Sequence, residues 1–297
     1  MRPFVATVAG LMLLLLMLQP AWAAQHQAAT PKGAFKPHER NRTPGLEIRV
    51  LAGAWGNARA EDIETVLYSV AAVLLEHFPG KRLNPILVFH SDTRPFILYE
   101  KGPNNEYRVD LTAKDGDWAQ YAYEFAHELS HILTHYERHA YPGTTAHNQW
   151  FEEALCEVAS LYVLRRLAVA WQVSPPHPDW AAYAPAFEKY AERFLSEPHR
   201  RLPPATSLAT WFAQNEQDLA RNPYLRGQNE VVANILLPFF EENPRLWLAI
   251  GCLNQEPKGN SFRDYMQTWH DNALEDCKGM IKHIMALFGV LPQPPRS

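Results

Sequence analysis

The sequence lacks an excess of positive charge: 28 lysine and arginine residues stand against 32 aspartate and glutamate residues, for a formal net charge of -4. Proteins that bind nucleic acid or an anionic membrane usually carry a basic patch or stripe. We therefore expect no nucleic-acid partner and no binding to an anionic membrane surface. Hydrophobic residues make up 47% of the 297 residues, which is enough for one large domain or two closely packed ones.

Cysteine is also scarce, with only Cys156, Cys252 and Cys277 in the chain. Cys252 and Cys277 could form a disulfide in an oxidising compartment, or each could stay a buried free thiol, and the sequence leaves both open. Cys156 would then be the odd residue, and we interpret it as a small core residue. No cysteine follows the apolar N-terminal run, so we expect no lipid anchor there.

The first residues have the pattern of a secretory signal. Arg2 precedes an apolar run from Phe4 to Leu18, and small residues follow at 21–24. Such a run is short for a membrane span and suits a signal that is cleaved after Ala23 or Ala24. We expect residues 1–24 to be removed and the protein to be periplasmic or secreted, with no stable membrane anchor after cleavage. An uncleaved anchor helix is the alternative.

Residues 25–45 are polar and without periodicity, which predicts a flexible leader. Beyond it, apolar and polar residues alternate over 46–51 and 107–112, and residues 85–90 are strongly apolar, which predicts three strands. The strand at 107–112 has the pattern of a sheet edge; it could form the rim of a cleft or be an ordinary edge. Residues 60–78 have apolar side chains at helical spacing and end at Pro79-Gly80, which predicts a helix.

The most informative stretch is His127-Glu128-Leu129-Ser130-His131, inside an apolar run. On a helix, residues four apart share one face, so the two imidazoles can reach one metal ion with Glu128 beside them. Asp117 can cap this helix, and Pro142-Gly143 predicts its end. The alternative is two ordinary histidines at helical spacing.

A catalytic zinc takes three protein ligands, so a third must come from elsewhere. His135 would lie about 12 Å along the axis from His127, at about 1.5 Å per residue, which is too far. A second helix from Asn148 contains Trp150-Phe151-Glu152-Glu153-Ala154-Leu155-Cys156-Glu157. We expect Glu153 to be the ligand and Glu157, four residues later, to accept a hydrogen bond from a ligand histidine.

Glu152 should point about 100° away from Glu153 on this helix and stay solvated. Two alternatives remain open. Glu153 and Glu157 could exchange roles, or all three carboxylates could form a solvated helix face.

These motifs together resemble the gluzincin metallopeptidases, in particular the M1 aminopeptidases, leukotriene A4 hydrolase and the peptidase MA-like families. The resemblance implies one Zn²⁺ ion on His127, His131 and Glu153, with Glu128 as general base. Pro223-Tyr224-Leu225-Arg226-Gly227 resembles the segment whose tyrosine donates to the oxyanion, which implies a catalytic Tyr224. The implied fold is α+β: a zincin-like part with a small mixed sheet at 46–177, followed by a helical part at 178–297.

We therefore expect an exported zinc metallopeptidase that acts on a peptide or protein. The Gly-x-Met-Glu-Asn segment with which M1 enzymes bind a free amine is absent, so aminopeptidase specificity does not follow. A zinc-binding envelope protein without turnover and a non-peptidase hydrolase on the same scaffold are the alternatives. In the C-terminal part the pattern predicts helices at 181–195, 207–220, 227–242, 244–253, 262–273 and 277–288.

Overall fold

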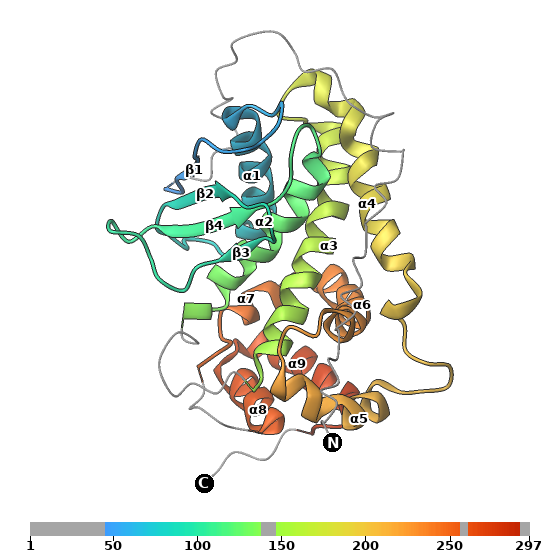
Figure 1. The fold of residues 1–297 in the computed structure, drawn as a ribbon. Helices are drawn as coiled ribbons and strands as arrows, with labels where there is room; N and C mark the ends of the chain where they lie inside the picture. Colours follow the sequence, from blue (N-terminus) through green and yellow to red (C-terminus); the bar gives the residue numbers. More distant parts are fainter. Residues whose placement is uncertain (1–44, 138–146, 256–260, 292–297) are drawn as a thin grey trace, which may run out of the picture. The chain divides into compact units, whose positions relative to one another are not determined.

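The computed structural model describes residues 45–137, 147–255 and 261–291 (Figure 1). The predicted signal at 1–24 lies outside the described residues, and the predicted leader reaches them only at Gly45. Within the described ranges, no helix has both the length and the apolar composition that crossing a membrane requires.

A small mixed sheet forms the N-terminal part. Its strand order is β1-β2-β4-β3, in which β1 (Ile48–Val50), β2 (Ile86–His90) and β4 (Tyr107–Leu111) are parallel. The two-residue strand β3 (Phe96–Ile97) pairs antiparallel with β4 at the edge of the sheet. The alternating pattern predicted β4 as an edge strand, and this is wrong, because β3 covers it.

Two helices cover one face of this sheet. Helix α1 (Ala60–Leu75) lies against β1, α2 (Trp118–Leu133) lies against β4 and β3, and the two helices contact each other. The predicted cap of α2 is confirmed, since the side chain of Asp117 accepts a hydrogen bond from the backbone N–H of Gln120 at 3.4 Å.

The predicted end of α2 at Pro142-Gly143 is not confirmed, because the helix ends at Leu133 and those two residues lie outside the described ranges. Two residues after Leu133, His135 has a φ of 62°, a left-handed conformation that does not continue an α-helix. The hydroxyl of Thr134 lies within hydrogen-bond distance of two acceptors, the backbone carbonyl of His131 at 3.0 Å and the carboxylate of Glu152 on the next helix at 2.8 Å.

Helix α3 (Gln149–Val173) is the centre of the core. It is buried on nearly every side, and it contacts α2 as well as α4 (Ala184–Ser196) and α6 (Arg226–Glu242). A helix that is apolar all round is typical of such a central position. Because α3 packs against helices of both predicted parts, the boundary at residue 178 is not a gap in the packing, and the division into two parts stays a prediction.

All regular elements of the described residues from 178 onward are helices, as the pattern predicted. Besides α4 and α6 these are η4 (Pro178–Tyr183), η5 (Pro198–Arg200), α5 (Leu208–Arg221), α7 (Leu246–Ile250), α8 (Phe262–Asn272) and α9 (Glu275–Leu287). Cys252 and Cys277 are free thiols, and Cys277 Sγ donates to the backbone carbonyl of Arg245 at 3.3 Å. The disulfide left open by the sequence is therefore not formed in this structure.

Candidate metal centre and active site

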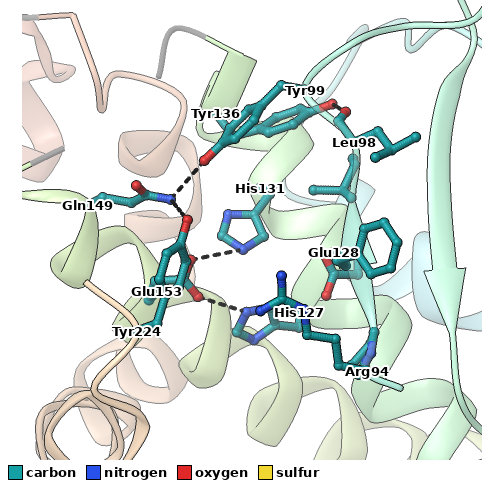
Figure 2. A pocket seen from close by; sticks show the side chains of 13 residues that line it. Arg94, Leu98, Tyr99, His127, Glu128, His131, Tyr136, Gln149, Glu153 and Tyr224 are labelled. Carbon is teal, nitrogen blue, oxygen red and sulfur yellow. Dashed lines mark hydrogen bonds and ion pairs between the residues drawn. The ribbon is translucent and has the colours of Figure 1, made fainter. Parts of the chain in front are cut away.

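His127 and His131 lie on the face of α2 that meets α3. Their ring centroids are 5.0 Å apart. Glu153 of α3 comes between them, with Oε2 at 3.2 Å from His127 Nε2 and Oε1 at 3.7 Å from His131 Nε2 (Figure 2). The structure therefore brings the three predicted ligands to one place, with both Nε2 atoms directed at the same carboxylate.

Glu152 is not solvated, contrary to the sequence prediction. Its carboxylate is fully buried and accepts from His131 Nδ1 at 2.7 Å, from the Thr134 hydroxyl at 2.8 Å and from Asn254 Nδ2 at 2.7 Å. A carboxylate can only accept, so Nδ1 of His131 carries a proton, and Nε2 is the nitrogen directed at Glu153. Glu152 thus has the role that we predicted for Glu157.

The carboxylate of Glu157 has hydrogen-bond partners other than the histidines. It accepts from the Tyr123 hydroxyl at 2.5 Å and from Arg200 at 2.7 Å. Burial alone would raise the pKa of Glu157, but Arg200 and Tyr123 outweigh it and lower that pKa. The predicted histidine partner is therefore wrong, because an arginine 43 residues later along the chain occupies the carboxylate.

Arg200 joins a larger ion-pair network. Its side chain is fully buried and also binds Glu230 at 2.8 Å and Glu197 at 2.9 Å. Arg226 donates to Glu230 at 2.7 Å and to the Tyr123 hydroxyl at 3.0 Å. This network ties α2, α3 and η5 to the start of α6, two residues after Tyr224.

His199 adds to the same network by contacting Glu230 at 2.6 Å. Potential metal-ligating atoms lie within 4.8 Å of one another in a second group, which consists of Glu197, His199 and Glu230. Because Arg200 and Arg226 already neutralise Glu230, these acids are an ion-pair cluster rather than a vacant ligand set.

Glu128 is buried beside the histidines. Burial raises the pKa of its carboxyl, and the neighbouring imidazoles of His127 and His131 only partly offset this. A carboxyl with a raised pKa next to a reaction centre is suited to accept and return a proton.

A pocket of about 350 Å³ lies in front of these side chains. Residues 94–99, which include the edge strand β3, line one side, and Gln149, Glu153 and Tyr224 line the opposite side (Figure 2). The predicted Tyr224 therefore shares a pocket with His127, Glu128 and His131. Tyr224 is 57% exposed.

Tyr99, which the sequence analysis did not single out, stands beside Tyr224. The Gln149 side-chain amide donates to both hydroxyls, at 3.1 Å for Tyr99 and 3.2 Å for Tyr224. Burial raises the pKa of Tyr99, and its hydrogen bond with Tyr224 adds to this. Because both oxygens accept from Gln149, the pair keeps a hydroxyl proton to donate elsewhere.

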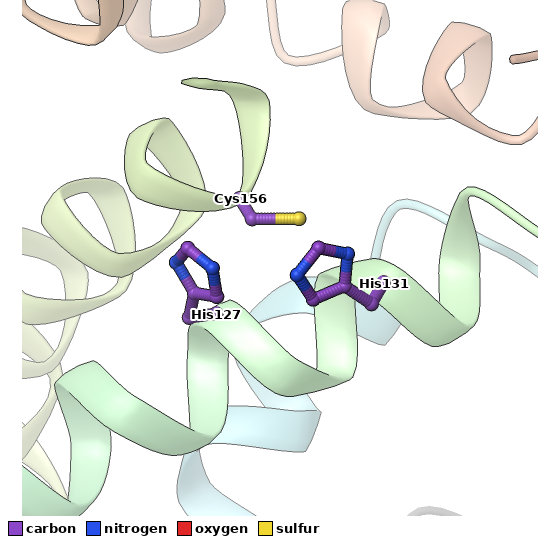
Figure 3. A group of neighbouring side chains, drawn as sticks. All are labelled: His127, His131 and Cys156. Carbon is purple, nitrogen blue, oxygen red and sulfur yellow. The ribbon is translucent and has the colours of Figure 1, made fainter. Parts of the chain in front are cut away.

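Cys156 also approaches the histidines. Its Sγ belongs to a group with one nitrogen each of His127 and His131, all within 4.8 Å of one another (Figure 3). Burial raises the pKa of this thiol to about 12. Cys156 is buried, as predicted. Its sulfur is also close enough to both histidines to compete with the Glu153 carboxylate as a metal ligand.

No protein-family model, curated protein or solved structure in our comparisons matches this chain. The arguments below therefore rest on the side chains themselves.

Proposed function

We propose that this protein is an exported zinc-dependent metallopeptidase with a zincin-like fold. The observation that carries the proposal is the convergence of His127 Nε2, His131 Nε2 and the Glu153 carboxylate at the back of a pocket. Two imidazoles and one carboxylate are a typical ligand set of a catalytic zinc, which keeps a further position for water or substrate.

The residues around these ligands fit a zinc ion. Glu152 fixes the ring of His131, and such a carboxylate behind a ligand histidine is a usual feature of zinc sites. When bound, zinc would supply Lewis acidity toward the substrate carbonyl and an activated water. The placement of β3 also suits a zincin, because an extended peptide can add to a free sheet edge beside the site.

The remaining chemistry belongs to the side chains that line the pocket. Glu128 would accept the proton of the attacking water and pass it to the leaving amide nitrogen. Tyr224 would donate its hydroxyl proton to the oxygen on which negative charge develops. Tyr99 and Gln149 would hold that hydroxyl in place.

The decisive experiment is a digest of a broad peptide library by the purified protein, with and without a chelator. We expect cleavage that the chelator abolishes and that added zinc restores. Glu128→Gln should keep zinc, measured by elemental analysis, but lose turnover by a factor of about 10² to 10⁴. Cleavage by Glu128→Gln at the wild-type rate would refute the assignment.

One feature favours a second function, a zinc-binding envelope protein without turnover. The three ligands come from α2 and α3, so a metal ion would cross-link the two central helices. Bound zinc without cleavage of any library peptide, together with a large loss of stability on chelation, would favour this alternative.

A further inference from the structure

Among the described residues that line the pocket, Arg94 is the one charged side chain that the proposed chemistry does not use. The other charged or titratable groups there are His127, Glu128, His131 and Glu153, together with the tyrosines. Arg94 is exposed, lies two residues before the start of β3, and extends toward the site (Figure 2).

Within the described part of the chain, Arg94 makes no ion pair and no hydrogen bond. Its neighbour Asp92 pairs with Lys114 at 3.0 Å instead. A guanidinium carries five donors in a planar fork that matches a carboxylate. An unpaired fork at the mouth of a pocket is therefore available to a carboxylate of the ligand.

The direction of β3 indicates which part of a peptide would meet Arg94. Antiparallel pairing is the more stable and the more common arrangement for an added strand. A peptide that pairs antiparallel with β3 would place its C-terminal side next to the beginning of β3, where Arg94 lies. Its N-terminal side would lie toward Tyr99, just after β3.

We propose that Arg94 selects peptides that carry a carboxylate on the C-terminal side of the cleaved bond. The carboxylate comes either from the C-terminus of the peptide or from an aspartate or glutamate side chain. This inference rests on the proposed peptidase function. It adds a substrate class, which neither the metal ligands nor Glu128 determine.

Cleavage of matched peptides tests the proposal once a cleaved sequence is known. One pair of peptides differs in a free or amidated C-terminus, and a second pair has glutamate or glutamine after the cleaved bond. We expect kcat/KM to favour one of the acidic peptides by about 10- to 100-fold, the usual worth of a hydrogen bond to a charged group. The pair that shows the preference identifies the source of the carboxylate.

The variants Arg94→Gln and Arg94→Glu should change this preference without changing zinc content. Arg94→Gln should remove it, and Arg94→Glu should reverse it in favour of peptides with lysine at that position. Arg49→Gln is the matched control, because Arg49 is exposed and belongs to β1 at the other edge of the sheet. Wild-type preference in both Arg94 variants, with cleavage intact, would overturn the proposal.

A binding measurement separates this inference from the peptidase proposal. Acetylated tetra-alanine with a free carboxylate and its amide are titrated into Glu128→Gln and into Glu128→Gln/Arg94→Gln by calorimetry. We expect tighter binding of the free acid only when Arg94 is present, even if no peptide is ever cleaved. Equal binding of acid and amide by both proteins, together with no acidic preference in cleavage, would contradict it.

Discussion

Glu153 and Glu157 lie one helical turn apart on α3, yet their surroundings differ. Glu153 meets two imidazoles, whereas Glu157 meets Arg200 and a tyrosine hydroxyl. An arginine is always charged and neutralises a carboxylate permanently, whereas an imidazole can give up its proton and then bind a metal through its nitrogen. From this comparison we expect that Glu153 is available to bind a metal, whereas Glu157 stabilises the fold.

The largest effect should come from exchanging each carboxylate for its amide. Loss of a residue that hydrogen-bonds a metal ligand lowers affinity by about 10- to 100-fold, and Glu153→Gln should lower zinc affinity by more than this because it removes a ligand. Activity should be lost as well. Glu157→Gln should keep one zinc per chain. Competition with a chromophoric chelator measures both affinities, and equal affinities would remove the distinction between the two sites.

Next in size is the loss of the buried cation in the Glu157 network. Arg200→Met leaves Glu157 and Glu230 without their shared partner, so we expect a loss of about 3–5 kcal/mol in the free energy of unfolding. Zinc content should not change. Arg245→Met is the control, because it removes an exposed pair with Asp276 and should cost less than about 1 kcal/mol. Urea unfolding of both variants decides whether the network is structural.

The third prediction concerns Tyr224, which lines the pocket two residues before Arg226 of the ion-pair network. Tyr224→Phe removes the proposed oxyanion donor, so kcat should fall by about 10²- to 10³-fold with KM little changed. Tyr162→Phe, a buried tyrosine on α3 that does not line the pocket, is the matched control and should keep kcat near the wild-type value. A selective rise in KM for Tyr224→Phe would instead assign the residue to substrate binding.

The smallest effect concerns Glu152, which supports the ligand His131 without being a ligand itself. Glu152→Gln keeps the shape of the side chain but weakens its hydrogen bond with His131 Nδ1. Zinc affinity should therefore fall by about 10- to 100-fold. Chelator competition measures this loss as well. A larger loss of affinity in Glu152→Gln than in Glu153→Gln would mean that Glu152, and not Glu153, is the third ligand.

Much of this fold follows from local patterns. The period of apolar residues and the Asp117 cap predicted α2 and its beginning, although not its end. The same reasoning placed the other predicted helices and the three longer strands within a few residues. Helix geometry predicted that His127 and His131 share a face. Glu153 lies on another helix and was expected as the third ligand from the resemblance to the gluzincins, while its exchange with Glu157 stayed open.

The remaining features depend on neighbours that are distant in sequence. Helix geometry shows that Glu152 and Glu153 point in different directions, but not that Asn254, 102 residues later, covers Glu152. Arg200 sits in a short 3-10 turn with no pattern that links it to Glu157. Strand β3 has two residues, too few for an alternating pattern, and so Arg94 and Tyr99 beside it carried no signal.

Zinc-edge X-ray absorption of the purified protein tests the central claim most directly, because it identifies the ligand atoms without requiring a substrate. The account predicts only nitrogen and oxygen ligands at about 2.0–2.2 Å, with the spectrum altered in Glu153→Gln and unchanged in Glu157→Gln. A sulfur ligand at about 2.3 Å would place Cys156 on the metal and contradict the assignment of Glu153. A protein that takes up no zinc would contradict the metal site altogether.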